Sequence, residues 1–320
     1  MLLDVQGLSV GIGTVNPLDG ITFAVDKGEI LGLVGESGSG KSLTALAIMG
    51  LLPLIGGRIT QGALMFQGQD LATLPEAKLR ALRGRRIGFV TQNPMTAMDP
   101  VQRIGPQVDV MSRLHLGLSA KAARARTVEL LTQLRIPEAT TICEAYPHQL
   151  SGGMKQRIVI AMALAGDPDL IVADEPTTAL DVTVQAQVIH ILTTLVRERG
   201  IGLVLITHDM GVVAQACDRV SVLYAGRLAE ARPAQALFAQ PSHPYTRALI
   251  DCIPREGMGA GALTGIPGAV PSVAAYPAGC RYHPRCARAL NMCATAAPAL
   301  TALPGQGWLA CHNPTGGTHG

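Results

Sequence analysis

Short apolar runs alternate along the chain with longer stretches in which apolar residues recur at helical spacing. Four runs are nearly continuous in Val, Ile and Leu, which predicts strands buried on both faces of a parallel sheet: residues 29–35, 86–92, 169–174 and 202–208. The predicted helices cover residues 41–52, 119–134, 152–165 and 182–199. This alternation predicts an α/β fold with a mainly parallel sheet. Residues 22–25 and 63–68 alternate more strictly and predict an antiparallel β layer.

The composition is that of an ordered protein with room for one large domain and a small appendage. Of the 320 residues, 48% are hydrophobic and 15% are charged. Uninterrupted apolar runs stay below the length of about 18 residues that would predict a membrane-spanning helix. The first residues, MLLDVQGLSV, lack the basic and apolar parts of a signal peptide, so we expect a cytoplasmic protein.

The composition changes towards the C-terminus. From about Pro254 onwards Gly, Ala and Pro dominate, and the apolar periodicity disappears. We place a boundary near residues 240–260, with a main domain over 1–250 and an extension over 251–320. Residues 257–320 carry three Arg and no other charged residue, so the rest of the chain is neutral overall (26 − 3 = 23 basic against 23 acidic residues). A neutral main domain predicts no nucleic-acid partner.

The stretch GESGSGKS, residues 35–42, follows a predicted strand and opens a predicted helix. In such a loop the glycines turn backbone N–H groups towards phosphate oxygens, the Lys reaches the β and γ phosphates, and the Ser hydroxyl holds Mg²⁺. The alternative, a Gly-rich turn without a ligand, is disfavoured by the strand–loop–helix setting. The predicted nucleotide-binding residues of this loop are Gly35, Glu36, Ser37, Gly38, Ser39, Gly40, Lys41 and Ser42.

Two adjacent carboxylates end the apolar run LIVADEP, residues 170–176. Asp174 is placed to hold Mg²⁺, and Glu175 could accept a proton from an attacking water. Alone, an Asp-Glu pair after a strand is often a solvated turn. Beside a phosphate loop it predicts a hydrolytic site.

The stretch LSGGMKQR, residues 150–157, predicts a second helix start that could bind an anion, with Ser151 as the N-cap. Alone it would be an ordinary capped helix, and the order of all the motifs decides. GESGSGKS is followed by Gln92 in VTQNP, then LSGGMKQR, VADEP, ALD (179–181) and THD (207–209). Over residues 1–250 the chain resembles the ABC-transporter ATPases.

The resemblance implies a fold and an assembly. The fold would be a P-loop NTPase core with an antiparallel β subdomain and a helical subdomain over about residues 95–165. Two such ATPase domains would face each other head to tail and enclose ATP and Mg²⁺ between them. Splitting the phosphate-binding groups across two chains makes hydrolysis depend on closure of the pair.

The resemblance also assigns roles to individual residues. Glu175 would act on the water, His208 would hold the γ phosphate and the water, and Gln92 would contact Mg²⁺ and sense the membrane subunit. The remaining roles are γ-phosphate binding across the dimer by Ser151, Gly152 and Gly153, coupling of the two sites by Asp181, and metal binding by Ser42, Gln92 and Asp174.

In one respect the chain departs from the family, which usually stacks an aromatic residue on adenine. That position lies near Ile12, and residues 8–20 hold no aromatic residue.

Longer stretches resemble one branch of the family, the oligopeptide/dipeptide importer ATPases. They are GESGSGKSLTALAIMGLL, TQNPMTAMDP, ADEPTTALDVTVQAQV, THDMGVVAQACDRV and SHPYTRALI (242–250). The resemblance implies a peripheral protein on the cytoplasmic face of the inner membrane that hydrolyses ATP to drive peptide uptake. Its partners would be a second ABC ATPase subunit that differs from this chain, two transmembrane permease subunits and an extracytoplasmic substrate-binding protein.

Two alternatives remain, a nickel or metal-chelate importer ATPase and a soluble ABC ATPase that acts on nucleic acid or ribosomes. The neutral main domain and the single ATPase unit disfavour the second. The permease contact is expected in residues 93–105, where Met95 and Met98 suit an adaptable apolar groove.

Four of the seven cysteines lie in the extension: Cys280, Cys286, Cys293 and Cys311. A cytoplasmic location disfavours disulfides, and the spacing lacks the close cysteine pairs of common zinc sites. Three nearby arginines would lower the thiol pKa values and offset the charge of a thiolate cluster: Arg281, Arg285 and Arg288. The family resemblance implies a [4Fe–4S] cluster in this extension, with zinc or free thiols as alternatives.

Overall fold

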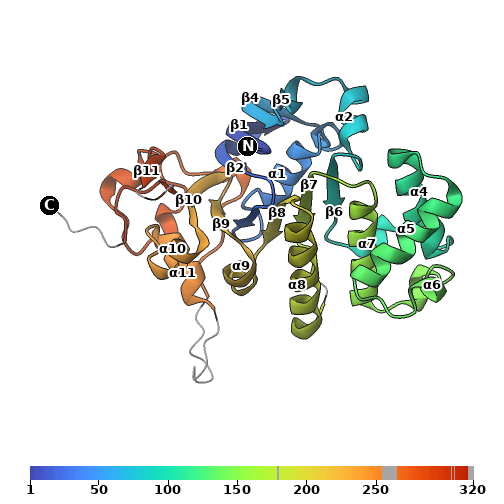
Figure 1. The fold of residues 1–320 in the computed structure, drawn as a ribbon. Coiled ribbons are helices and arrows are strands. Elements are labelled where there is room, and N and C mark those ends of the chain that lie inside the picture. The colour runs from blue at the N-terminus through green and yellow to red at the C-terminus, as the bar shows by residue number, and fades with distance from the viewer. Residues whose placement is uncertain (179, 254–264, 304, 306, 316–320) are drawn as a thin grey trace. The chain divides into compact units, whose positions relative to one another are not determined.

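The computed structural model describes residues 1–178, 180–253, 265–303, 305 and 307–315 (Figure 1). The chain divides into two compact units. The first unit comprises Met1–Leu2, Val25–Ile30 and Thr73–Ile206, and the second comprises Leu3–Ala24, Leu31–Ala72 and Thr207–Gly320.

The sheet of the first unit consists of three parallel strands, β6 (Ile87–Val90), β7 (Leu170–Asp174) and β8 (Gly202–Thr207). Every residue of β7 and β8 is buried, as expected for strands covered on both faces. The carboxyl end of β7 carries the predicted acid pair, so the parallel register places this pair at one edge of the sheet.

Three helices of the first unit, α5 (Ala120–Gln133), α7 (Gly152–Ala165) and α8 (Val182–Glu198), agree closely with the predicted ranges 119–134, 152–165 and 182–199, whereas the other described helices were not predicted individually. Helices α4, α5 and α7 pack together, and α7 is buried over most of its length (Figure 1). The helices are α2 (Glu76–Leu82), α3 (Pro94–Ala97), α4 (Ile104–Leu116), α5 (Ala120–Gln133), α6 (Ala139–Ile142), α7 (Gly152–Ala165) and α8 (Val182–Glu198), with a 3₁₀ turn η3 (Pro147–Gln149).

The second unit contains the predicted antiparallel layer. It is a four-stranded sheet in the order β2-β1-β4-β5, formed by β1 (Leu3–Ile12), β2 (Val15–Val25), β4 (Gly57–Phe66) and β5 (Gln69–Asp70). Strands β1 and β4 run antiparallel over most of their length. The alternation of apolar and polar residues around 63–68 therefore predicted this layer correctly.

A second group of strands in this unit leads from the phosphate loop to the C-terminal extension. Strand β3 (Ile30–Val34) pairs parallel with β9 (Arg219–Tyr224), and β9 pairs antiparallel with β10 (Arg227–Pro233). Strands β12 (Gly307–Leu309) and β11 (Thr301–Leu303) continue the sheet from β10. The extension thus adds its own strands to the edge of the sheet.

The helices of the second unit are short. Helix α1 ends at Ile48, earlier than predicted, because Gly50 adopts a left-handed conformation (φ 63°) and turns the chain out of the helix. The elements are α1 (Lys41–Ile48), α9 (Met210–Ala216), α10 (Ala234–Ala239) and α11 (Pro244–Asp251), with the 3₁₀ turns η1 (Leu52–Ile55), η2 (Leu71–Thr73), η4 (Val273–Ala275), η5 (His283–Arg285) and η6 (Asn291–Ala294).

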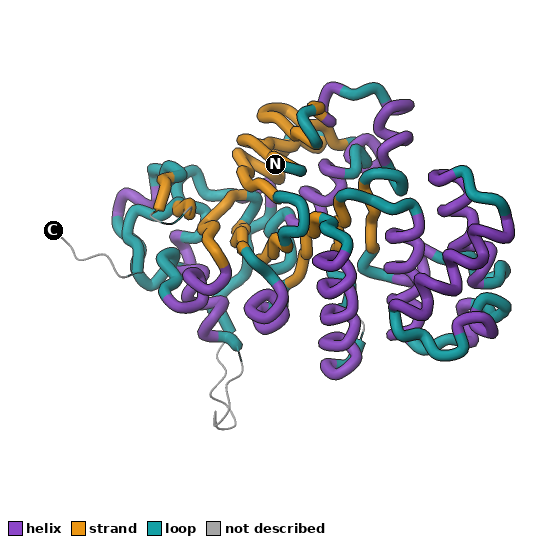
Figure 2. The backbone as a smooth tube through the Cα atoms, in the orientation of Figure 1, coloured by secondary structure: helices purple, strands orange, loops and turns teal. Residues whose placement is uncertain are grey.

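Beyond α11 the described chain is mostly loop with short turns and two short strands (Figure 2). This agrees with the loss of apolar periodicity in the sequence. The predicted boundary at 240–260 falls partly on residues 254–264, outside the described residues, and the limits of the two domains stay a prediction. In the described part of the chain, no helix combines the length and the apolar character needed to span a bilayer.

Candidate nucleotide-binding and hydrolysis site

The phosphate loop connects β3 to α1 in the second unit, and its glycines are required by the backbone. Gly35 has a φ of 152°, and a Cβ atom there would lie 2.2 Å from the carbonyl oxygen of Leu223. Gly40 has a φ of 102°, and a Cβ atom there would lie 2.3 Å from Cδ2 of Leu18. Both positions therefore exclude a side chain, which is what a loop built from backbone donors needs.

The side chain of Lys41 closes this loop. Its Nζ donates hydrogen bonds to the carbonyl oxygens of Gly35 (2.7 Å) and Glu36 (3.0 Å), and only 5% of Lys41 is exposed. Around this buried ammonium group, Ser37, Gly38 and Ser42 are exposed. The loop thus combines a fixed positive charge with an accessible rim, an arrangement suited to a polyphosphate.

Gly35→Ala is expected to destabilise the loop because the added Cβ collides with the backbone of Leu223. We expect ATP affinity to fall about tenfold or more, with a loss of about 1–3 kcal/mol in unfolding free energy. Equilibrium ATP binding and thermal unfolding measure the two effects. Gly38→Ala is the matched control, since Gly38 also has a positive φ (80°) but a Cβ there meets nothing within 4 Å. Equal effects of the two substitutions would contradict the steric argument.

At the end of β7, in the first unit, the structure brings Gln92 and Glu175 together. The Nε2 atom of Gln92 donates a hydrogen bond to Oε2 of Glu175 (3.1 Å), and the Thr178 hydroxyl donates to the same oxygen (2.8 Å). Glu175 adopts a left-handed backbone conformation (φ 47°), and its N–H is bonded to the carbonyl oxygen of Ile206 (2.9 Å). Its neighbour Asp174 is 9% exposed. A strained backbone that aims a carboxylate is typical of a reactive position.

Two capped helix starts also lie near each other in the first unit. Ser151 caps α7 by accepting a hydrogen bond from the N–H of Met154 (3.3 Å), as predicted. Asp181 caps α8 by accepting from the N–H of Val184 (3.0 Å). A Cβ atom on Gly153 would lie 2.5 Å from Cγ1 of this valine, so the glycine allows the two helix starts to approach closely.

The predicted site residues are thus divided between the two units. The phosphate loop and the exposed His208, which directly follows β8, belong to the second unit. The first unit holds Gln92, Ser151, Gly152, Gly153, Asp174, Glu175 and Asp181. The aliphatic position near the expected adenine contact, Ile12, lies at the end of β1 opposite Gly57 and is half-buried.

Sequence reasoning missed two residues that contact the phosphate loop within the second unit. The Tyr245 hydroxyl accepts a hydrogen bond from the N–H of Glu36 (2.9 Å). The guanidinium of Arg285 forms an ion pair with the Glu36 carboxylate, with the nearest oxygen at 2.8 Å. Both residues lie more than 200 positions from Glu36, so no local spacing could have linked them.

The four cysteines of the extension line the same small cavity but do not form a metal site. Among the described residues, no group of three or more His, Cys, Asp or Glu side chains is arranged to hold a metal ion. The prediction of an iron–sulfur cluster at Cys280, Cys286, Cys293 and Cys311 is therefore wrong.

The physical reason lies in the arginines. Arg281 and Arg285 form ion pairs with Asp19 and Glu36, whereas Arg288 lines the cavity of the cysteines and donates to Asn313. Burial raises the pKa of the Cys280 and Cys286 thiols, and it raises the pKa of Cys311 to about 11. Burial thus disfavours the thiolate form of these three residues, and the thiolate is the form that binds a metal.

A strand that leads into a glycine loop with a buried lysine, followed by a helix, is the phosphate-binding unit of the P-loop ATPases. A second strand that ends in paired carboxylates and a capped Ser-Gly-Gly helix start completes the set of groups used by ABC ATPases. Comparison with known proteins agrees with this class. Residues 18–178 match the ABC transporter family, and residues 229–293 match the C-terminal region of oligopeptide/dipeptide transporters.

Individual relatives cover nearly the whole chain. The chain is 43% identical to the dipeptide transport ATP-binding protein DppD of Bacillus subtilis, over 94% of this chain and 91% of that protein. It is 45% identical to the oligopeptide transport ATP-binding protein OppD of Salmonella typhimurium, over 98% of this chain and 94% of that protein. A dimeric ATP-binding cassette solved after hydrolysis, with ADP and phosphate bound, aligns at a TM-score of 0.64 with 27% identity, over 73% of this chain and 99% of that chain.

The chain belongs to the ABC-transporter ATP-binding proteins, in the branch with the oligopeptide/dipeptide C-terminal region. This confirms the predicted family, the α/β P-loop fold and the ATPase activity, with ATP and Mg²⁺ as cofactors. The relatives are named for ATP binding and peptide transport, and nothing in them supports an iron–sulfur cofactor. The roles of individual site residues stay predictions.

Proposed function

We propose that this chain is the ATP-hydrolysing subunit of an ABC importer that drives dipeptide or oligopeptide uptake. The observation that best supports this proposal is the 45% identity to an oligopeptide transport ATP-binding protein over 98% of the chain. The match of residues 229–293 to the C-terminal region of oligopeptide/dipeptide transporters supports the same branch. The alternative of a nickel or metal-chelate importer has no comparable support.

The proposed chemistry divides the work among groups already described. The phosphate loop binds the polyphosphate through its backbone N–H groups and the ammonium of Lys41. Glu175 orients the attacking water and accepts its proton as the bond between the β,γ-bridging oxygen and the γ phosphorus breaks. ADP leaves with the electron pair of that bond, and inorganic phosphate is the other product.

Other residues of the proposed site would bind Mg²⁺ and the remaining phosphate oxygens. Ser42 and Asp174 offer hard oxygen ligands of the kind that Mg²⁺ prefers, and Mg²⁺ would neutralise phosphate charge. Gln92 and His208 position the reacting groups. The helix start at Ser151, Gly152 and Gly153 would bind the γ phosphate of a nucleotide held by a second ATPase subunit, and Asp181 would couple the two sites.

The proposed assembly contains a second ATPase subunit, two transmembrane permease subunits and an extracytoplasmic substrate-binding protein, on the cytoplasmic face of the membrane. A related cassette is dimeric, which supports pairing. In the segment predicted to contact the permease, Met95 is 43% exposed and Val101 is 79% exposed, whereas Met98 is buried. Met95 and Val101 therefore remain available for that contact, and Met98 serves the core.

Transport by the intact complex tests this function. The chain would be co-expressed with the permease and ATPase subunits encoded beside it, reconstituted into vesicles with the substrate-binding protein, and supplied with ATP. We expect ATP-dependent uptake of radiolabelled di- or oligopeptides and no uptake of nickel. Uptake of nickel without uptake of peptide would contradict the proposal.

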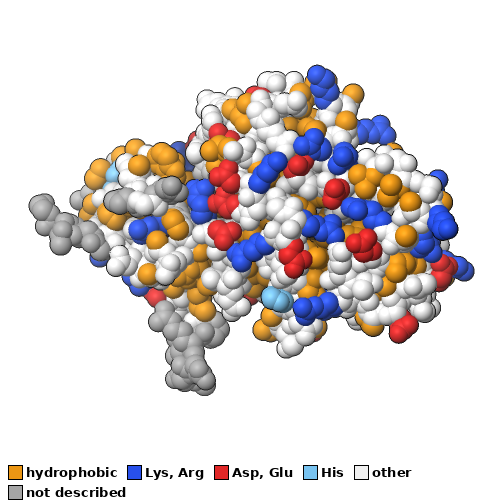
Figure 3. Space-filling model, viewed as in Figure 1, with side chains coloured by type: hydrophobic (Ala, Val, Ile, Leu, Met, Phe, Trp, Pro, Cys, Tyr) orange, Lys and Arg blue, Asp and Glu red, His pale blue; other side chains and the backbone are white. Residues whose placement is uncertain are grey.

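On the face shown in Figure 3, Lys and Arg side chains are interspersed with Asp and Glu side chains. Such mixing leaves no dominant sign of charge on this face. The predicted lack of a nucleic-acid partner stays a prediction.

A further inference from the structure

Arg285 links the C-terminal extension to the phosphate loop. Its Nη1 and Nη2 atoms donate to the two carboxylate oxygens of Glu36 at 2.8 and 3.0 Å. Its other hydrogen bonds go to the Tyr224 hydroxyl (3.3 Å) and to the carbonyl oxygens of Pro267 (2.7 Å) and Ile266 (3.2 Å). The Arg285 side chain is only 5% exposed, so this bidentate pair is shielded from water on the arginine side. A fixed and shielded guanidinium fork is stronger than an ordinary surface ion pair.

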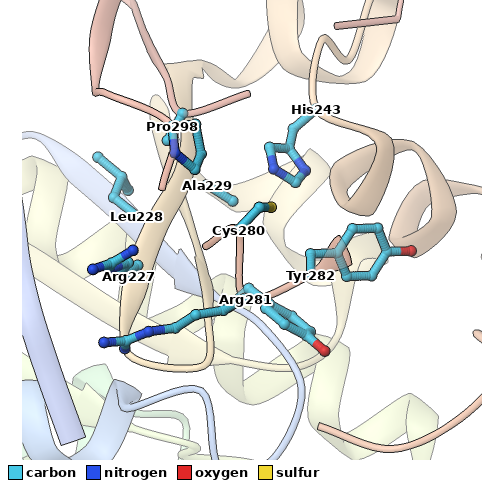
Figure 4. A pocket seen from close by; sticks show the side chains of 10 residues that line it. Arg227, Leu228, Ala229, His243, Cys280, Arg281, Tyr282 and Pro298 are labelled. Atoms are coloured by element: carbon cyan, nitrogen blue, oxygen red, sulfur yellow. The ribbon is translucent and has the colours of Figure 1, made fainter. Parts of the chain in front are cut away.

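The residues before Arg285 anchor this segment on the same unit. Figure 4 shows that the side chains of the neighbouring residues Cys280 and Arg281 point in different directions. The Arg281 side chain extends towards Arg227, and Cys280 lies near His243. Arg281 and Arg227 both donate to Oδ2 of Asp19, at 2.9 and 2.7 Å. The segment therefore has its own attachment to the unit and does not depend on Glu36 alone.

An aromatic cluster holds the segment from another side. The ring of Tyr282 packs against Tyr224 (5.0 Å between centroids) and Tyr245 (5.1 Å). Tyr245 is fully buried and its hydroxyl binds the N–H of Glu36. The extension and α11 thus reach the same loop residue together.

Glu36 is bonded both to the residues that hold the extension and to the lysine of the phosphate loop. Its carboxylate is held by Arg285, its N–H by Tyr245, and its carbonyl oxygen accepts from Nζ of Lys41 (3.0 Å). Glu36 is itself a negative charge within the loop that must receive a polyphosphate. Without a paired cation, this carboxylate would repel ATP and could turn towards Lys41.

We propose that Arg285 is a positioning residue for ATP binding: it neutralises Glu36 and fixes the loop conformation in which Lys41 faces the phosphates. The proposal rests on the phosphate loop being the nucleotide site. It gives the C-terminal extension a direct part in ATP affinity, through one ion pair, in addition to any part in assembly. Because Arg285 contacts the phosphate loop through the Glu36 carboxylate, its effect on ATP passes through Glu36.

A double-mutant cycle tests this inference in the full-length chain. Arg285→Met is expected to weaken ATP binding about tenfold, because an unpaired carboxylate then faces the phosphates. The loss should be larger for ATP than for ADP, since repulsion grows with phosphate charge. In the assembled transporter the KM for ATP should rise while kcat at saturating ATP changes less than about threefold.

Repeating Arg285→Met in a Glu36→Gln protein shows whether the loss of ATP affinity comes from the unpaired Glu36 charge or from a general loss of stability. We expect Arg285→Met to cost less than about threefold in ATP affinity when Glu36 is already an amide. The same tenfold loss in both backgrounds would overturn the inference, because Arg285 would then act independently of Glu36. If Arg285→Met prevents folding, Arg285→Gln replaces it, because glutamine removes the charge but keeps hydrogen-bond donors, and the same dependence on Glu36 is required.

Two controls make failures distinguishable. Arg288→Met removes another arginine of the extension, one that binds Asn313 and Pro314, and should leave ATP affinity within twofold of the unchanged protein. Lys41→Ala must lose ATP binding in the same assay. If Lys41→Ala loses binding and Arg285→Met does not, the Arg285 inference alone is overturned. If Lys41→Ala binds ATP normally, the nucleotide site itself is misplaced and the inference falls with it.

Discussion

Glu175→Gln is expected to bind ATP with nearly unchanged affinity and to hydrolyse it at least about a hundredfold more slowly, the usual loss when a general base is removed. The amide keeps the size of the carboxylate and still offers an oxygen to Gln92 and Thr178, which now bond Oε2 at 3.1 and 2.8 Å. What it loses is the ability to accept a proton from water. Binding and chemistry should therefore separate in this variant.

The measurement pairs equilibrium ATP binding with the rate of phosphate release by the assembled transporter. Glu198→Gln, at the end of helix α8 and remote from the acid pair in sequence, is the matched control and should retain the original rate. A Glu175→Gln transporter with near-normal turnover would reject Glu175 as the base. An equal loss of binding and turnover would instead indicate a structural role.

The parts of the fold that follow local rules were predictable. The runs that became β7 and β8 are continuous in apolar residues because both faces of these strands are covered. Helix α7 has the predicted limits, Gly152 and Ala165, because Ser151 caps its first turn. The glycines of the phosphate loop could be predicted as well, since Gly35 and Gly40 adopt conformations that exclude side chains.

The features that depend on tertiary packing were not predictable. Arg285 and Glu36 are 249 positions apart, and their pairing follows from how the extension packs on the sheet. The same packing directs Arg281 to Asp19, so two of the three arginines expected near the thiols contact the ATPase domain instead. The methionine side chains of Met95 and Met98 suit either a groove that contacts the permease or the protein core. Only the structure shows that Met95 is exposed and Met98 is buried.

Lys41→Ala is expected to lower ATP affinity about a hundredfold or more, because truncating one partner of a buried charged contact costs several kcal/mol. Lys41 is 5% exposed, and its Nζ also holds the carbonyl oxygens of Gly35 and Glu36 at 2.7 and 3.0 Å. The substitution therefore removes a positive charge and two bonds that close the loop. Both losses act on phosphate binding before any chemical step.

Lys41→Met distinguishes the loss of the lysine charge and its two hydrogen bonds from a simple loss of side-chain volume. Methionine fills most of the space of the lysine stem but carries no charge, so it should restore thermal stability more than it restores ATP affinity. Titration with ATP and with ADP, beside thermal unfolding, measures both. Lys78→Ala, on an exposed face of helix α2, is the control for loss of a lysine as such and should bind ATP normally. Full ATP affinity in Lys41→Met would mean that the backbone of the loop binds the phosphates without help from the lysine charge.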